Sequence, residues 1–203
     1  MADDLVIRGY RDSDLASAYD VCVRTGDGGE DASGSYADPD VLPAVFLGPY
    51  VTLEPELAFV VDNGNRVVGY IVGTADTAEF TRRYAAEWLP KVGDAYPAPA
   101  GEPAGGDELM AMLLHWPERM LRPELADYPA HLHIDLLPDY QRMGLGRRLI
   151  DTLCAALRAR GVCGLHLEML TSNTRARAFY DRLGFTELPA DTTDTTILGL
   201  RLD

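Results

Sequence analysis

The chain has 203 residues, of which 47% are hydrophobic and 25% charged, and this balance predicts a single globular domain over residues 1–203. Its net charge of −14 argues against nucleic acid as a partner, because phosphate backbones bind basic surfaces. No apolar stretch approaches the roughly 20 residues that cross a bilayer, so we expect no membrane partner. The three cysteines form no metal or redox pattern, which is typical of a reducing compartment and predicts a cytoplasmic protein.

The first part of the chain predicts short elements around one hairpin. In chain order these are a strand at 5–8, a helix after a cap at Asp12 or Ser13, a loop at 26–43, a short helix at 41–47 ended by Gly48-Pro49-Tyr50, and strands at 57–61 and 67–74. Asn63-Gly64 between the last two apolar runs is a strong hairpin signal.

The second part of the chain predicts helices followed by alternating strands and helices. In chain order these are a helix around 80–89, a Pro-, Gly- and Ala-rich linker at 97–106, a short helix at 109–114, a strand at 131–137, a leucine-rich helix from Leu145 to Gly161, a strand at 165–170, a helix from Asn173 to Gly184, and strands at 185–188 and 195–202. The strands at 131–137 and 165–170 should be parallel, since a helix connects them. The pattern therefore predicts an α+β fold with one mixed, mostly antiparallel sheet, a central parallel strand pair and helices on both faces.

The stretch that follows the 131–137 strand indicates an anion site. Gln141, Gly144 and Gly146 form a short loop that leads directly into the leucine-rich helix. The first N–H groups of a helix lack internal partners, and glycines let a ligand approach the backbone closely. Residues 141–182 carry a net charge of +5 inside an otherwise acidic chain. This basic segment fits a small polyphosphate, while the acidic remainder either favours a cationic amine or only maintains solubility.

A second motif, Asn173-Thr174-Arg175-Ala176-Arg177-Ala178-Phe179-Tyr180-Asp181-Arg182-Leu183-Gly184-Phe185, follows downstream. Together with the Gln-x-x-Gly-x-Gly loop it strongly resembles the GNAT superfamily of acetyl-CoA-dependent acyltransferases. More narrowly, the chain resembles the acetyltransferase-like domain attached to O-GlcNAcases and its free-standing bacterial relatives. The resemblance implies acetyl-CoA as co-substrate. It also makes residues 77–128 a helical insertion beside the cleft and places acceptor contacts in the loop at 26–43.

The resemblance also implies a set of cofactor contacts. These are Leu136, Leu137, Gln141, Arg142, Met143, Gly144, Leu145, Gly146, Arg147, Asn173, Phe179 and Tyr180. In this scheme the loop binds the pyrophosphate, the Leu136 N–H faces the thioester carbonyl, and the strand edge pairs with the pantetheine amides. Tyr180 matches a tyrosine that faces the cofactor sulfur, and its phenol suits a thiolate leaving group. Asn173 either binds the pantetheine arm, caps its helix, or does both.

Four residues are candidates to remove the proton from an attacking amine. His131, His133 and Asp135 alternate along one strand and so share a face, while Glu168 stands on the neighbouring strand. An ordinary histidine pKa favours His133, whereas Asp135 adjoins Leu136 and needs a raised pKa or a water relay. The resemblance to the O-GlcNAcase-like group favours Asp135. Some of these side chains are also expected to form a buried polar network.

The predicted function is transfer of an acetyl group from acetyl-CoA to a primary amine by direct attack. The acceptor is a small-molecule amine or a protein or peptide lysine, and the protein is a monomer or homodimer. One alternative is a module that binds acetyl-CoA without turnover. A remote alternative is a metal-dependent hydrolase that uses His131, His133, Asp135 and Glu168, although their spacing matches no known metal motif.

Overall fold

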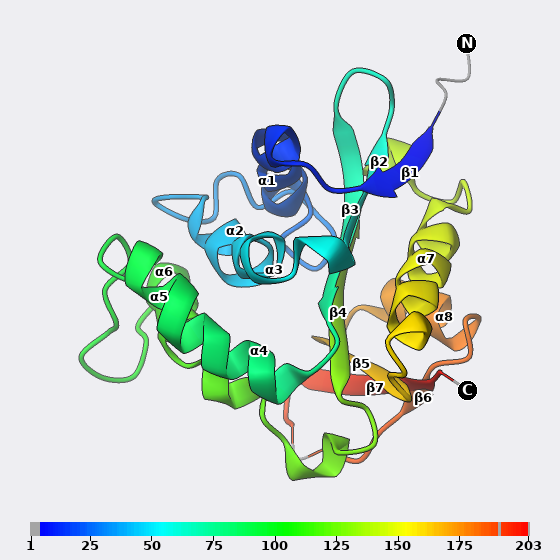
Figure 1. Cartoon of the computed structure of the whole chain (residues 1–203). Coiled ribbons are helices and arrows are strands. Elements are labelled where there is room, and N and C mark those ends of the chain that lie inside the picture. Colours follow the sequence, from blue (N-terminus) through cyan, green and yellow to red (C-terminus); the bar gives the residue numbers. More distant parts are fainter. Residues whose placement is uncertain (1–4, 191, 203) are drawn as a thin grey trace.

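The computed structural model describes residues 5–190 and 192–202. Its centre is a seven-stranded sheet with the order β1-β2-β3-β4-β5-β7-β6 (Figure 1). The strands are β1 (Val6–Gly9), β2 (Ala58–Asp62), β3 (Val67–Thr74), β4 (Ala130–Leu136), β5 (Gly164–Leu170), β6 (Thr186–Glu187) and β7 (Thr195–Arg201). Only β4 and β5 pair in parallel; all other neighbours are antiparallel. The predicted α+β class with a central parallel pair is confirmed.

Helices cover both faces of this sheet. They are α1 (Leu15–Arg24), α2 (Val41–Phe46), α3 (Gly48–Leu53), α4 (Thr77–Arg83), α5 (Leu89–Val92), α6 (Gly106–His115), α7 (Leu145–Ala159) and α8 (Thr174–Asp181). In Figure 1, α1 to α6 lie on one side of β3 and β4, and α7 lies on the other side. The leucine stripe of α7 is buried, as its four-residue spacing predicts.

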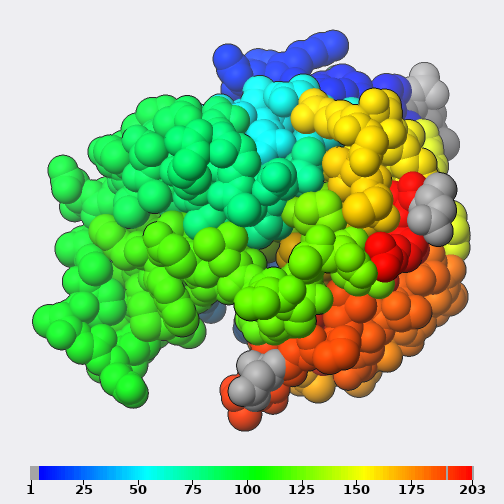
Figure 2. Space-filling model, turned by 60° about the horizontal axis from the view of Figure 1, so that its bottom comes forward, coloured from blue at the N-terminus to red at the C-terminus, as the bar shows by residue number. Residues whose placement is uncertain are grey.

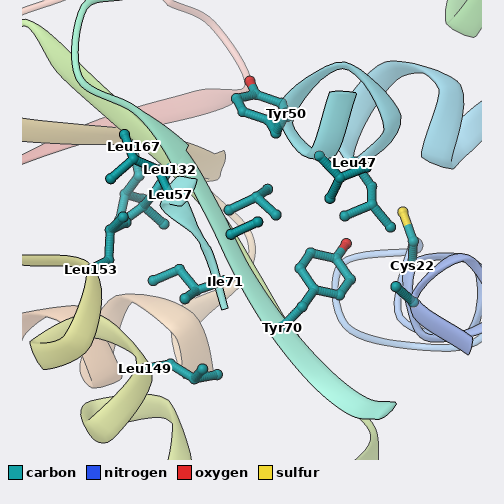
Figure 3. Packing of buried hydrophobic residues seen from close by; sticks show 14 of the residues in the cluster. Cys22, Leu47, Tyr50, Leu57, Tyr70, Ile71, Leu132, Leu149, Leu153 and Leu167 are labelled. Carbon is teal, nitrogen blue, oxygen red and sulfur yellow. The ribbon is translucent and has the colours of Figure 1, made fainter. Parts of the chain in front are cut away.

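Alternation along β3 distributes its side chains between these two layers. All eight residues of β3 are buried, which is expected of a strand covered on both faces. Figure 3 shows Tyr70 directed toward Cys22 on α1, and Ile71 directed to the opposite side, toward Leu149 on α7. Residues opposite each other in antiparallel strands share a face, so Asp135, which lies opposite Tyr70, points to the α1 side.

The sequence Gly48-Pro49-Tyr50 separates α2, which ends at Phe46 as predicted, from a second helix that was not predicted. It begins α3, because proline is well tolerated in the first turn of a helix, where its missing N–H would have no partner. Gly48 is required by packing, since a Cβ there would lie 2.6 Å from the Trp88 ring. As a consequence Tyr50 is a helical residue, 1% exposed, in the middle of the core.

Residues 77–128 are mostly helical, as predicted. The amphipathic helix around 80–89 is α4, continued by a π-helical turn at Tyr84–Trp88 and by α5. It buries Phe80, Tyr84 and Trp88. The predicted short helix at 109–114 is the centre of α6, and short 3₁₀ turns at Pro117–Met120 and Pro123–Leu125 lead to β4. Proline is the first residue of both turns, where a backbone N–H would have no partner within the turn in any case.

The strand predicted at 185–188 is shorter than expected. β6 contains only Thr186 and Glu187. Phe185 instead donates its N–H to the carbonyl oxygen of Tyr180 at 3.2 Å, and therefore completes the C-terminal cap of α8. The cap fixes Tyr180 and Phe185 against each other, with ring centroids 5.3 Å apart.

Candidate active site

One edge of β4 is open along most of its length. β4 pairs with β5 only at Ala130 and His131, and beyond that point β5 turns away from it (Figure 1). On the other edge the Leu137 N–H donates to the carbonyl of Val68 at 3.0 Å. Hydrogen-bonding groups alternate in direction along a strand, so the neighbouring Leu136 N–H faces the open edge. The backbone can therefore receive an extended ligand beside β4.

The loop after β4 leads into α7 with its backbone amides uncovered. Arg142 and Gly144 adopt left-handed conformations, with φ of 61° and 79°. The first bond inside α7 joins the Arg148 N–H to the Gly144 carbonyl at 3.2 Å, so the amides of 145–147 have no acceptor within the helix. Gln141 Nε2 donates to the Leu136 carbonyl at 2.9 Å and ties the loop to β4. This nest of N–H groups fits a pyrophosphate.

Gly146 allows α7 and α8 to approach each other. A Cβ at this position would lie 3.0 Å from Phe179 Cζ and 3.6 Å from Leu136 Cδ1. Phe179 therefore stands beside both the loop and the end of β4. Met143 and Arg147 are exposed near the same helix start, and Arg147 also donates to the Arg182 carbonyl at 3.0 Å.

Asn173 and Tyr180 occupy the two ends of α8. Asn173 Oδ1 accepts from the Ala176 N–H at 3.0 Å, so it is the helix cap. Its Nδ2 donates to the Gly28 carbonyl at 2.9 Å, which holds the 26–40 loop beside α8. Tyr180 is 8% exposed. Burial, reinforced by the charge of Asp135, raises the pKa of Tyr180 above its usual value, so the phenol stays protonated and lies near that carboxylate.

Asp135 lies on the α1 side of β4, in contact with Tyr70. The Tyr70 hydroxyl donates to Asp135 Oδ2 at 2.6 Å. Burial raises the pKa of Asp135 to about 6, although the hydrogen bond from Tyr70 opposes this shift. The same burial, together with the Asp135 charge, raises the pKa of Tyr70 well above its usual range. Asp135 is therefore a carboxylate at pH 7 whose pKa is close enough to neutrality for proton transfer.

A chain of hydrogen bonds fixes the protons of both β4 histidines. Thr77 Oγ1 donates to the Pro129 carbonyl at 2.8 Å, so it must accept from His131 Nδ1, 2.7 Å away. Burial lowers the pKa of His131 well below its usual value, so the ring is neutral and its Nε2 is an acceptor. The Tyr50 hydroxyl donates to that nitrogen at 2.7 Å and accepts from His133 Nε2 at 3.1 Å.

This chain leaves His133 Nδ1 as a fixed acceptor. Within 5–190 and 192–202, no group bonds to that nitrogen. Burial, reinforced by the charge of Arg119, lowers the pKa of His133 to about 3. His133 is thus neutral at pH 7 and a poor base, but it is able to accept a hydrogen bond from a bound donor. The predicted buried polar network is confirmed for the two histidines.

Glu168 lies apart from these groups. On β5 it is exposed and accepts from Thr195 Oγ1 at 2.5 Å and from Arg122 Nη2 at 3.3 Å. The four residues of the metal interpretation do not converge, because the histidine nitrogens bond to Tyr50 and Thr77. In the described ranges, no group of three His, Cys, Asp or Glu side chains is suited to hold a metal ion.

The 26–40 loop joins the helical region to α8, where Asn173 bonds to Gly28. The Ala37 N–H donates to Asp107 at the start of α6 at 2.9 Å, and Tyr96 donates to Asp38 at 2.9 Å. Figure 2 shows a notch between the green surface of the 77–128 region and the orange C-terminal region.

Sequence reasoning missed several residues of this site. Tyr50 and Thr77 set the histidine protons, Tyr70 supports Asp135, and Arg119 influences His133. Only Tyr70 carried a usable signal, since its position in a fully apolar strand places its hydroxyl in the core, where it needs a partner. The others depend on contacts between distant segments.

Comparison with known proteins agrees with the fold and the loop. A model of the acetyltransferase (GNAT) family matches residues 103–185. The crystal structure of SsHAT is 52% identical, has a TM-score of 0.95, and each chain is covered to 98%. The O-GlcNAcase of Rattus norvegicus is 26% identical over 184 residues, which are 90% of this chain and 20% of that protein. The ribosomal protein bS18-alanine N-acetyltransferase of Escherichia coli K12 is 54% identical over 50 residues, or 25% of this chain and 34% of that one.

The chain spans only about a fifth of the length of the O-GlcNAcase that it matches. The part that it matches nevertheless covers nearly all of this chain, and the SsHAT structure matches it from end to end. The resemblance predicted from the two motifs is therefore confirmed. The chain belongs to the GNAT family of acetyltransferases.

Proposed function

We propose that this protein is an acetyl-CoA-dependent N-acetyltransferase that acts on a primary amine by direct attack. The observation that carries the proposal is the grouping of three features at the open edge of β4. These are the free Leu136 N–H, the Asp135 carboxylate with a pKa of about 6, and the buried, protonated Tyr180. They match a hydrogen-bond donor for a developing oxyanion, a base and an acid.

The co-substrate acetyl-CoA supplies an acetyl group activated as a thioester. The amides of the loop and of the α7 start would bind its pyrophosphate, with Arg142 and Arg147 exposed beside them. The edge of β4 at Leu136 and Leu137 would pair with its amide-containing arm. Phe179 stands where that arm would pass between α7 and α8. The left-handed conformations of Arg142 and Gly144 form this nest and so support the proposed binding.

Asp135 and His133 would have different roles toward the acceptor amine. A base must be deprotonated before it can take a proton, and a pKa of about 6 leaves Asp135 as a carboxylate at pH 7. His133 is also unprotonated, but its pKa of about 3 makes it a much weaker proton acceptor. We assign the amine proton to Asp135 and the orientation of the amine to His133 Nδ1. Tyr180 would protonate the departing sulfur.

The acceptor is a small-molecule amine or a lysine of a protein or peptide. The relative from Escherichia coli is named for an alanine of a ribosomal protein, which shows that family members differ in acceptor. Within the described residues no helix is both long and apolar enough to cross a bilayer. The net charge of −14 favours a cationic acceptor over nucleic acid. The negative surface repels polyanions that come within about a Debye length of it.

The test is CoA-thiol release with acetyl-CoA and a panel of amines across pH 5 to 10. Asp135→Asn should lower kcat at pH 7 about a hundredfold or more, as expected for loss of a general base. Asp151→Asn, an exposed carboxylate on α7, is the matched control. Calorimetry with acetyl-CoA runs in parallel. Binding without release for every amine would mean a binding module, and wild-type kcat in Asp135→Asn would reject the base assignment.

A further inference from the structure

Arg119 is an exception among the arginines of this chain. The other partly buried arginines each form an ion pair with a carboxylate; they are Arg8, Arg24, Arg66, Arg83, Arg122 and Arg177. Arg119 is also partly buried, but within 5–190 and 192–202 no carboxylate lies within 4.0 Å of it. A half-buried charge without a counter-ion is costly, and it is unexpected in a chain with a net charge of −14.

Two buried donors near the histidines lack acceptors. Among the side chains that the structure describes, only Arg119 Nε and the Tyr84 hydroxyl are buried N or O atoms without a hydrogen-bond partner. Tyr84 is 2% exposed and lies at the start of the π-helical turn, a kind of distortion that is frequent at functional sites. Both groups donate hydrogen bonds. Two unsatisfied donors in one region call for an acceptor, and a carboxylate offers four lone pairs.

Both donors belong to the surroundings of His133. Tyr84 packs on Phe80, with ring centroids 6.1 Å apart, and Phe80 stacks on Tyr50 at 4.5 Å. Tyr50 in turn bonds to His133. Arg119 lies in the 3₁₀ turn Pro117–Met120, which packs against α4, the helix that carries Phe80. Its charge also acts on Tyr84, Tyr50 and His133. The unpaired guanidinium therefore stands on the acceptor side of β4, and not beside the loop proposed for the pyrophosphate.

We propose that Arg119 and Tyr84 form a subsite for a carboxylate group of the acyl acceptor. The acceptor is then an amine that carries a carboxylate in the same molecule. The inference rests on the proposed acetyl transfer, because the amine end is placed at Asp135. His133 is two positions from Asp135 on β4, so a carboxylate bound on the His133 side lies roughly 7 Å along the strand from an amine at Asp135. An ω-amino acid meets this requirement, whereas an α-amino acid is too short.

The subsite also accounts for the two signs of charge in the site. Asp135 attracts the ammonium end, which must lose its proton before attack, and Arg119 holds the opposite end away from it. Arginine binds carboxylates through paired N–H groups, so it orients the acceptor as well as attracting it. A simple alkylamine can fill only the Asp135 end and should bind weakly.

The test compares 6-aminohexanoate with hexylamine, which has the same chain length but no carboxylate. Wild-type protein should prefer 6-aminohexanoate in kcat/KM by about tenfold or more, the effect of one charged hydrogen bond. Arg119→Met and Tyr84→Phe should reduce or remove this preference through KM for 6-aminohexanoate. Both should leave KM for acetyl-CoA unchanged, and Tyr84→Phe should also leave the rate with hexylamine unchanged. Arg82→Met, on an exposed arginine paired with Glu79, is the matched control.

A second measurement separates this proposal from the proposed function. Calorimetry of 6-aminohexanoate with wild-type protein, Arg119→Met and Tyr84→Phe reports binding whether or not an acetyl group is transferred. Tyr84→Phe removes a hydroxyl that has no partner, so its thermal unfolding temperature should not fall. Equal use of both amines by wild-type protein, or an equal loss with both amines in Arg119→Met, would overturn the subsite. Carboxylate-dependent binding without any CoA release would support the subsite and reject the enzyme.

Discussion

Tyr70→Phe should move the pH dependence of catalysis without removing any proposed catalytic group. The Tyr70 hydroxyl donates to Asp135 Oδ2 at 2.6 Å and stabilises the charged carboxylate. A hydrogen bond to a charged group contributes about 1.5–3 kcal/mol, and 1.36 kcal/mol corresponds to one pKa unit. Its loss should raise the pKa of Asp135 from about 6 by roughly one to two units. A base is active when deprotonated, so a higher pKa moves the acid limb of the rate profile to higher pH.

The assay is kcat/KM for the best amine from pH 5 to 10 in wild-type protein and in Tyr70→Phe. The wild-type acid limb should lie near pH 6. The rates are compared at a fixed concentration of free amine, so that deprotonation of the amine itself does not set the limb. The mutant limb should lie between about pH 7 and 8, with a wild-type plateau above it. Tyr96→Phe is a matched control, because Tyr96 also donates to an aspartate, Asp38, but away from β4.

Two results would refute this reasoning. An unmoved acid limb in Tyr70→Phe would show that Asp135 does not govern the rate. A loss of the plateau with an unmoved limb would show that Tyr70 supports packing around Cys22 and α1, but not the charge of Asp135.

Three further predictions concern Asp135, Gly146 and Tyr180. Asp135 has a pKa of about 6 in the folded protein, above its unfolded value of about 3.9. Its carboxyl group therefore does not lower the free energy of unfolding below pH 4, but lowers it as the pH rises from 4 through 6. Urea unfolding should therefore show Asp135→Asn more stable than wild type at pH 8 by up to about 3 kcal/mol, and equally stable at pH 4. Gly146→Ala places a Cβ 3.0 Å from the Phe179 ring and should weaken acetyl-CoA binding about tenfold in calorimetry, with Gly101→Ala, in an open loop, as control. Tyr180→Phe keeps the ring and removes the proton, so it should lower kcat while the Kd for acetyl-CoA stays level; an effect on Kd alone would contradict the acid role.

Local patterns were sufficient to predict the framework of the site. The alternation of His131, His133 and Asp135 placed them on one face, and the glycine loop between an apolar run and a leucine stripe located the start of α7. Both patterns depend only on neighbouring residues, because side-chain direction repeats every two residues in a strand and about every 3.6 in a helix. For this reason both patterns can be recognised without any knowledge of tertiary contacts.

The remaining parts of the site depend on contacts between distant segments. Tyr50 reaches His131 across 81 positions, and Thr77 reaches it across 54. The sequence around Tyr50 indicated the end of α2 but not the start of α3, because the packing of Gly48 against Trp88 cannot be inferred from Gly-Pro itself. The protonation states of the histidines follow only once the Pro129 carbonyl is known to accept from Thr77. Glu168 shared a predicted neighbourhood with His133, but β5 turns away from β4 before reaching it.

The division of work along β4 follows from one property of strands. Side-chain direction and hydrogen-bond direction both alternate with a period of two. Asp135 points its side chain to the acceptor side and lies opposite Tyr70 in the register with β3, while Leu136 points its side chain to α7 and its N–H to the open edge. A slip of one residue against β3 would exchange both assignments at once: a leucine would face the acceptor, and the Leu136 N–H would be consumed by β3. The register of β3 and β4 is therefore as important to the proposed chemistry as any single side chain. This register requires glycine at position 69, because a Cβ there would lie 2.3 Å from Leu136 Cδ2.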